Sequence, residues 1–241
     1  MKFCVCIKQV PDVQASVQTG RMVLNAYDAS AVEQALVINE NGTDEIDLIL
    51  IGPASATETI RKALAMGASN ATHIVMENVA DLDSSAIAHL LAESLKGSNY
   101  DAILTGKQSQ DSDSGLAGGM LAELLGIPYA TNAVGMEATA DGLLVTRQGD
   151  TGQEMLVLKA PCLVTCSNDM NNPRIPSLKG IMGAKRTTIN TVQAGPVGTP
   201  KTKVEKTFPP AGRAPGLKME GEPEELVAQL ITKLQQEAGA I

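Results

Sequence analysis

The stretch that decides the fold is Asp101–Leu125, DAILTGKQSQDSDSGLAGGMLAELL. It opens with the short apolar run Ala102–Thr105, which ends at Gly106 and is typical of a buried strand. The polar run Lys107–Gly115 follows, and apolar residues then recur at helical spacing. The pattern predicts a strand, a polar loop and the start of a helix. In an open parallel sheet, the first N–H groups of such a helix lack partners and attract phosphate.

This junction has two interpretations from the residues alone. Small residues at positions 114, 115 and 117–119 let a ligand approach the backbone, which favours a phosphate site. In many α/β proteins, however, Ser and Asp at this place only cap the following helix. Asp111 and Asp113 could also serve acid–base chemistry or bind a metal, although capping is the commoner role. The residues leave these interpretations open.

The composition excludes several classes of protein. The chain has 241 residues, 44% of them hydrophobic, which is enough for one large or two modest domains. A net charge of −8 provides no basic face, so nucleic acid is not an expected partner. No apolar run reaches membrane-spanning length, and the start lacks the blocks of a signal peptide. We therefore expect a cytoplasmic protein without membrane insertion.

The residues indicate neither a metal centre nor a catalytic centre. None of the four cysteines has C-x-x-C spacing, and buried reduced thiols are expected. Both histidines, His73 and His89, lie where helix or strand packing accounts for them. No H-E-x-x-H, G-x-S-x-G or P-loop motif occurs, and no G-x-G-x-x-G follows the first strand. A protein that holds a nucleotide without substrate chemistry of its own fits better than a hydrolase.

Strands and helices alternate in the first half of the chain. This alternation predicts βαβ units with right-handed crossovers, and hence a doubly wound parallel sheet of the α/β class. Residues 13–24 predict an irregular excursion with a hairpin around Thr19-Gly20. Strands are expected at 2–8, 46–51, 73–76 and 102–105, and helices at 29–39, 57–65, 84–95 and 116–125.

The pattern changes after Pro128. Short apolar runs separated by Asp-Gly turns predict antiparallel strands that extend the sheet. Residues 168–186 predict a loop, whose aliphatic side chains either form a docking surface or fold back into the core. Residues 191–221 predict an extended arm, and residues 222–237 an amphipathic helix that must bury its apolar face on its own domain or on a partner. We divide the chain into a nucleotide-binding α/β domain, 1–190, and a C-terminal arm with its helix, 191–241.

Five short segments occur in the order and spacing of a known family: Val5–Asp12, Asn25–Asp28, Ala63–Ala68, Gly106–Asp113 and Pro173–Met182. Over essentially its whole length the sequence resembles the β subunit of electron-transfer flavoproteins. The resemblance implies a nucleotide-α-hydrolase-like sheet in a heterodimer with an α subunit that carries an FAD. That FAD takes electrons from a flavin dehydrogenase, such as an acyl-CoA dehydrogenase, and passes them on.

The resemblance also implies a second nucleotide in this chain. In ordinary members it is a structural AMP, and in electron-bifurcating members it is a second FAD that takes hydride from NADH. AMP-type members carry Asn-Gln-Thr where this chain has Gly115-Leu116-Ala117. Asp83-Ser84 and Gly198-Thr199-Pro200 resemble the bifurcating branch. We therefore expect FAD in the β site, with structural AMP as the alternative.

The family's site residues carry over onto two groups of positions, with no catalytic residue and no metal ligand among them. The segment that anchors partner dehydrogenases corresponds to Arg174, Leu178, Ile181 and Met182. The nucleotide should contact the strand ends and the loop after the fourth strand. These positions are Cys6, Lys8, Asn25, Ala26, Tyr27, Asp28, Ile51, Gly52, Ser84, Gly106, Lys107, Gln108, Asp111, Ser112, Asp113, Ser114, Gly115, Leu116 and Ala117.

Overall fold

Two compact units make up the chain, Met1–Lys203 and Val204–Ile241. The computed structural model describes residues 1–12, 20–40, 45–206, 208, 211–212 and 215–239. Within these residues, no helix has the length and apolar character that crossing a bilayer requires.

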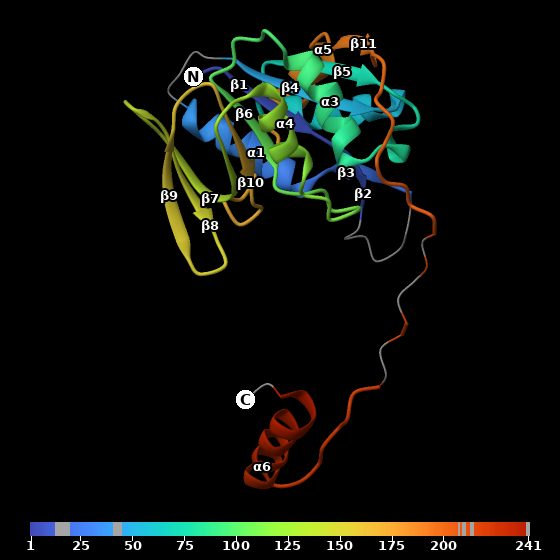
Figure 1. Ribbon diagram of the computed structural model, residues 1–241, viewed down its shortest axis with the longest axis vertical. Helices are drawn as coiled ribbons and strands as arrows, with labels where there is room; N and C mark the ends of the chain where they lie inside the picture. Colours follow the sequence, from blue (N-terminus) through green and yellow to red (C-terminus); the bar gives the residue numbers. More distant parts are fainter. Residues whose placement is uncertain (13–19, 41–44, 207, 209–210, 213–214, 240–241) are drawn as a thin grey trace. The chain divides into compact units, whose positions relative to one another are not determined.

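A nine-stranded sheet forms the centre of the first unit, in the order β11-β5-β4-β1-β6-β10-β7-β8-β9 (Figure 1). All pairs from β11 to β7 are parallel, and the pairs β7–β8 and β8–β9 are antiparallel. The predicted α/β fold with its antiparallel extension is thereby confirmed. The strands are β1 (Phe3–Ile7), β4 (Ile46–Gly52), β5 (Asn70–Val75), β6 (Ala102–Gly106), β7 (Tyr129–Thr139), β8 (Gly142–Gln148), β9 (Gln153–Leu158), β10 (Cys162–Cys166) and β11 (Asn190–Gln193).

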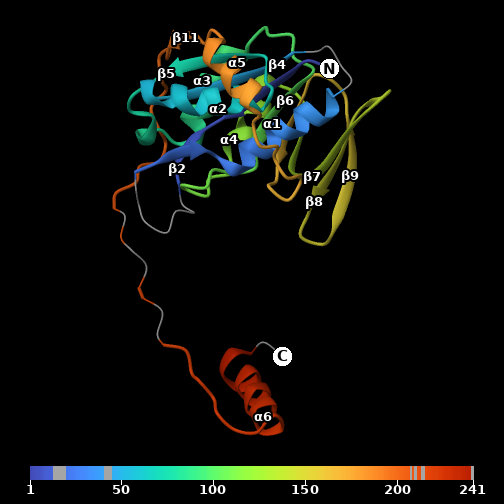
Figure 2. The same cartoon turned by 180° about the vertical axis from the view of Figure 1, so that it is seen from behind.

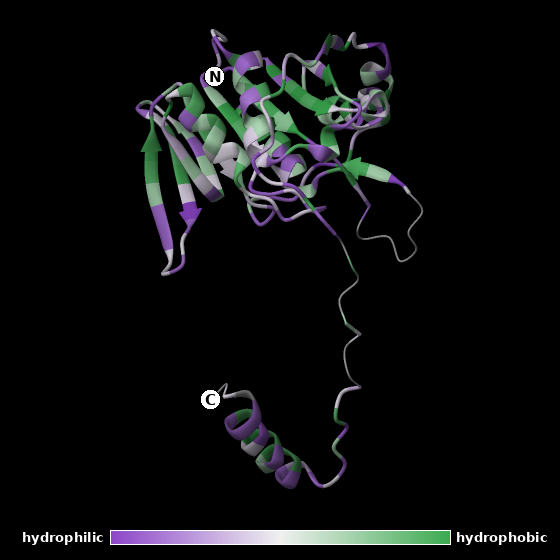
Figure 3. Ribbon diagram, turned by 45° about the vertical axis from the view of Figure 1, so that its right-hand side comes forward, coloured by the Kyte–Doolittle hydropathy of each residue, from purple (hydrophilic) through white to green (hydrophobic). Residues whose placement is uncertain are grey.

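Helices cover both faces of this sheet, as Figures 1 and 2 show from opposite sides. Alternation along β1 separates two cores: Phe3 and Val5 pack with α1 and α2, whereas Cys4 and Cys6 pack with α3 and α4. The central strands are accordingly hydrophobic along most of their length (Figure 3). The helices are α1 (Ala26–Ile38), α2 (Thr57–Met66) and α5 (Leu178–Arg186) on one face, and α3 (Ser84–Leu95) and α4 (Ala117–Leu125) on the other. All four cysteines are buried free thiols, as predicted.

One strand contradicts the prediction that the second half is antiparallel. β10 lies between β6 and β7 and pairs in parallel with both. Its five residues are all buried, which is the pattern of a central parallel strand. The turns around it could be recognised in the sequence, but the return of the chain to the middle of the sheet could not.

Two helix predictions also need correction. α1 begins at Ala26, three residues earlier than expected, because Asn25 itself is the N-cap. The predicted loop at 168–186 ends in α5, whose N-cap Ser177 accepts a hydrogen bond from the Gly180 N–H at 3.0 Å. Gly180 obscures the helical pattern but is required there, since a Cβ would lie 2.4 Å from the Ala65 carbonyl oxygen.

A separate two-stranded antiparallel sheet pairs β2 (Gln9–Pro11) with β3 (Met22–Leu24). The hairpin predicted around Thr19-Gly20 falls between these strands, and Thr19 lies outside the described residues.

The first unit extends beyond the predicted boundary at residue 190. β11 pairs in parallel with β5, and the Ala194 N–H donates to the Val75 carbonyl at 3.2 Å. In the second unit, α6 (Pro223–Lys233) confirms the predicted C-terminal helix. Its apolar residues Val227, Leu230 and Ile231 are all exposed.

Candidate functional site

The carboxyl ends of β1 and β6 form the switch point of the sheet. From β1 the chain builds β4 and β5 on one side, and then crosses over to place β6 on the other. In open α/β sheets, ligands bind in the crevice that such a reversal creates. Lys8 follows β1, Gly106 ends β6, and the start of α1 lies against both.

Asp28 joins the two strand ends. Its buried carboxylate accepts the Lys8 N–H at 2.7 Å through Oδ2 and the Gly106 N–H at 3.0 Å through Oδ1. Glycine is required at position 106, because a Cβ would lie 2.2 Å from Oδ1 of Asp28. Burial raises the pKa of Asp28 to about 7, although hydrogen bonds from Asn25, Lys8 and Gly106 oppose the rise.

Asn25 and Gln110 clamp the loop after β6 onto the start of α1. Asn25 donates from Nδ2 to the Gln108 carbonyl at 2.8 Å and accepts the Gln110 N–H through Oδ1 at 3.1 Å. The Gln110 side chain in turn accepts the Ala26 N–H at 3.1 Å. Gln110 was missed in the sequence; its place inside the same polar run as Gln108 and Asp111 was the available signal.

Charged and polar side chains of the loop satisfy one another. Lys8 Nζ lies 2.9 Å from both carboxylate oxygens of Asp111, and Gln108 Nε2 donates to Asp113 at 2.8 Å. Burial alone would raise the pKa of Asp111, but the hydrogen bond and charge of Lys8 lower it. The capping interpretation of these carboxylates is wrong, because Leu116, the N-cap of α4, brings no side-chain hydrogen bond.

The backbone at the end of the loop is left with free donors. Within the described residues, none of the six consecutive N–H groups from Ser114 to Gly119 has a hydrogen-bond acceptor. The Ser114 hydroxyl lies 2.6 Å from that of Ser84 at the start of α3. Unpaired amides at a helix N-terminus carry partial positive charge, so this segment suits an anion such as phosphate.

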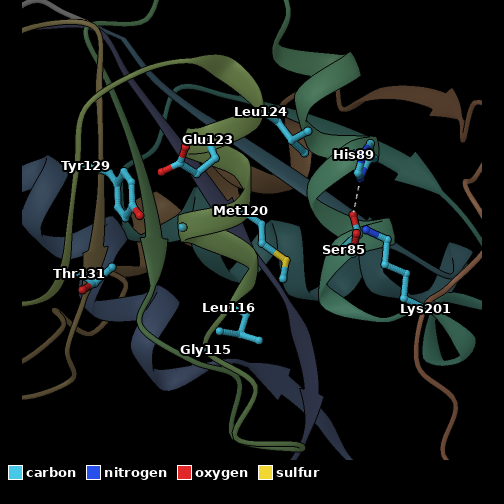
Figure 4. Close-up of a pocket in the computed structure, with 11 residues that line it drawn as sticks. Ser85, His89, Gly115, Leu116, Met120, Glu123, Leu124, Tyr129, Thr131 and Lys201 are labelled. Atoms are coloured by element: carbon cyan, nitrogen blue, oxygen red, sulfur yellow. Dashed lines mark hydrogen bonds between the residues drawn. The ribbon is translucent and has the colours of Figure 1, made fainter.

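The apolar side chains predicted to contact the nucleotide do not join this hydrogen-bonded network. Cys6 and Ile51 direct their side chains into the core under α3, so only their backbone lies at the sheet edge. The Gly52 carbonyl accepts the Met76 N–H at 2.9 Å. Leu116 is 63% exposed and lines, with Met120 and other residues of α3, α4 and β7, an open depression of about 510 Å³ (Figure 4).

The predicted docking segment is built around an internal ion pair. Arg174 donates to Glu33 of α1 from Nε at 2.8 Å and from Nη2 at 2.9 Å, and its own N–H donates at 3.0 Å. Burial alone would raise the pKa of Glu33, but Arg174 lowers it. The aliphatic side chains that follow do not return to the core. Their exposed fractions are 92% for Ile175, 75% for Leu178, 41% for Ile181 and 51% for Met182.

A family model and several known proteins match this chain over most of its length, and they all indicate the same family. The family model of the electron transfer flavoprotein domain matches residues 15–197. The electron transfer flavoprotein beta subunit of Bradyrhizobium diazoefficiens is 36% identical over 256 aligned positions that cover 100% of both chains. The chain belongs to the beta-subunit family of electron transfer flavoproteins. The beta subunit of Syntrophomonas wolfei is 33% identical, covering 95% of this chain and 94% of its own. The caffeyl-CoA reductase-Etf complex subunit CarD of Acetobacterium woodii is 32% identical, over 98% of both chains.

In this electron transfer flavoprotein beta subunit, most of the predicted nucleotide residues converge at the switch point. Lys8, Asn25, Ala26 and Asp28 form one hydrogen-bonded network with the loop 106–113. Ser84 reaches the same loop through Ser114. The predicted partner residues belong to a different surface, on α5 and the segment before it.

Proposed function

We propose that this beta subunit pairs with an α subunit and holds a nucleotide at the β1–β6 crevice, with its phosphate on the free amides of residues 114–119. The proposal rests on the difference between the side chains of the loop and the backbone amides at its end. Its side chains are bonded to one another and to α1, whereas its last amides are left without acceptors among the described residues. A preorganised row of N–H donors supports anion binding without further rearrangement.

Charge around the loop suits a phosphate that is held mainly by backbone. Lys8 is neutralised by Asp111, so it adds little positive charge. Lys107 in the same loop has no ion pair within the part of the chain that the structure describes. A phosphate would then bind the amides of Ser114, Gly115 and Ala117, with Lys107 as a flexible counter-charge.

We further propose that the nucleotide is FAD. Gly115, Leu116 and Ala117 offer no polar side chain, so they bring none of the contacts of an AMP-type Asn-Gln-Thr segment. Asp83-Ser84 and Gly198-Thr199-Pro200, which resemble the electron-bifurcating branch, support the same choice. When bound, FAD would supply hydride acceptance from NADH and electron transfer to the flavin of the α subunit. This chain's own residues would hold and orient it.

The exposed aliphatic surface of α5 is suited to the docking of a flavin dehydrogenase that exchanges electrons with the complex. Exposed apolar side chains that lie side by side mark protein–protein interaction sites. Leu178 lies at the first position of α5 and projects most of its side chain into solvent. We propose that it anchors a partner such as an acyl-CoA dehydrogenase.

The test is a nucleotide count on the purified αβ complex. Flavin absorbance gives the FAD content, and chromatography of the released nucleotides gives their identity. Two FAD per heterodimer, both reducible by NADH, is the expected result. One FAD with one AMP would establish the structural-AMP alternative. A complex with a single FAD and no second nucleotide would contradict both.

A further inference from the structure

Asp83 binds α3 and the C-terminal arm at the same time. Its Oδ1 accepts the Ala86 N–H at 2.9 Å and so caps α3. Its Oδ2 accepts the N–H groups of Lys201 at 2.6 Å and Thr202 at 3.0 Å, and the Thr202 hydroxyl lies at 3.4 Å. These contacts, first that of Ala86 and then those of the arm, hold the pKa of Asp83 below its usual range. The arm is therefore fixed one residue before the first unit ends at Lys203.

The next residue, Ser84, binds the loop after β6. Its Oγ lies 2.6 Å from Oγ of Ser114, the residue at which the row of free amides begins. The Ser114 carbonyl accepts the Ser109 N–H at 3.2 Å, which ties Ser114 into the body of the loop. Figure 4 shows Lys201 beside Ser85, with Leu116 across the same depression. Two consecutive residues thus connect the loop and the arm to the same helix end.

α3 is a rigid support for this connection. Ala88, Leu91 and Leu95 bury one side of the helix in the second core. The arm upstream of the contact is also held, because Val197 packs against that core and Ala194 bonds to β5. The start of α3 is thus hydrogen-bonded to two segments, the loop at Ser114 and the arm at Lys201 and Thr202.

We propose that Asp83 and Ser84 couple occupancy of the loop to attachment of the arm. A phosphate bound to the amide of Ser114 fixes that residue and, through Ser84, the start of α3, so that Asp83 holds the arm more firmly. By linkage, a partner that holds the arm favours nucleotide binding by the same factor. The identity of the ligand rests on the proposed function, whereas the connection itself rests on the hydrogen bonds.

Amide hydrogen exchange of the full chain, with and without AMP as the probe, tests the coupling. Saturating AMP should slow exchange at Lys201 and Thr202 roughly 2- to 10-fold, the range of one solvent-accessible hydrogen bond. Ser84→Ala should abolish this slowing, measured at an AMP concentration that saturates the variant. Ser85→Ala, one position further along α3, is the matched control and should behave like the parent. Slowing that persists in Ser84→Ala would overturn the proposal.

A second comparison needs no nucleotide. Asp83→Ser keeps an N-cap for α3 but removes the acceptor of the arm. It should raise exchange roughly 2- to 10-fold at Ser109 and Asp113, whose amides are bonded within the loop. Unchanged exchange there would refute the coupling, whether or not AMP binds. Suppose that Asp83→Ser raises exchange at Ser109 and Asp113, but the chain binds neither AMP nor FAD. This result would refute the proposed function and support the coupling.

Discussion

The loop after β6 and the segment that leads into α5 both have an irregular sequence. In the folded chain they differ in which groups are hydrogen-bonded or buried and which are left available. In the loop, the Gln108 side chain donates to Asp113 and Asn25 binds the loop backbone, while among the described residues the amides at the end of the loop have no acceptor. In α5, the helix satisfies the backbone and aliphatic side chains such as Leu178 are left exposed. Each region leaves open the group that its proposed ligand requires, N–H donors for an anion and apolar surface for a protein.

The comparison suggests how the two surfaces can be separated by mutation. A change that disturbs the support of the loop should remove nucleotide and leave partner docking intact. A change on α5 should do the reverse.

Gly106→Ala should have the largest effect. A Cβ at this position would lie 2.2 Å from Asp28 Oδ1, so the strand end must move away from α1. We expect a loss of about 1–3 kcal/mol in the free energy of unfolding, measured by denaturant titration, together with loss of bound nucleotide. Gly183→Ala, where a Cβ meets open space, is the control and should be neutral or stabilising. Full nucleotide content in Gly106→Ala would show that the junction is not part of the site.

Asp28→Asn should change how stability depends on pH. The folded chain keeps this proton up to a pKa of about 7, whereas the unfolded chain releases it near 3.8. Ionisation of Asp28 therefore lowers the free energy of unfolding as the pH rises from about 4 to about 7, with a slope of at most about 1.4 kcal/mol per pH unit. The difference between parent and Asp28→Asn, followed by denaturant titration across this range, should show that slope. Asp113→Asn serves as the control, and a difference independent of pH would contradict the assignment.

Leu178→Ala should weaken electron transfer from the dehydrogenase by about 1–2 kcal/mol of docking free energy, or roughly 5- to 30-fold in apparent affinity. Nucleotide content should stay at the parent value, because α5 shares no hydrogen bond with the loop among the described residues. Met155→Ala on β9 removes a similarly exposed apolar side chain and should leave transfer unchanged. An equal loss of electron transfer in Leu178→Ala and Met155→Ala would show that α5 is not the docking surface.

Asp111→Asn should have the smallest effect on stability. The Lys8–Asp111 ion pair is partly solvent-exposed, and such pairs contribute about 0.2–1 kcal/mol. Removing the Asp111 charge leaves Lys8 as an uncompensated positive charge at the loop, so phosphate affinity at low salt should rise slightly. Calorimetric titration with AMP at two salt concentrations measures the change. A fall in affinity would mean that Asp111 itself contacts the ligand.

The sequence predicts the parts of this molecule that depend on local pattern. Apolar runs ending at polar junctions located β1, β4 and β6, and the capping residues located α3 within one residue. The order of strands is not local: β10 could not be placed beside β6 from its own five residues. Contacts between distant segments were missed for the same reason. Asp83 and Lys201 are 118 positions apart, and no spacing rule joins them.

The segment that anchors the docking surface was only partly predictable. Arg174 was expected to face a partner, but its guanidinium is bonded to Glu33, 141 positions earlier in the chain. The aliphatic residues beside it carried no signal that separates an exposed surface from a buried one. Only the folded position of α5 against α2, which Gly180 permits, decides that they face solvent.

We propose that the amides of residues 114–119 hold the phosphate of a nucleotide. A titration of the ¹⁵N-labelled chain with AMP, followed by amide chemical shifts, observes these groups directly. We predict saturable downfield shifts concentrated in Ser114–Gly119, with the amides of residues 178–186 unchanged. Saturable binding that leaves Ser114–Gly119 unshifted and moves amides elsewhere would contradict the account.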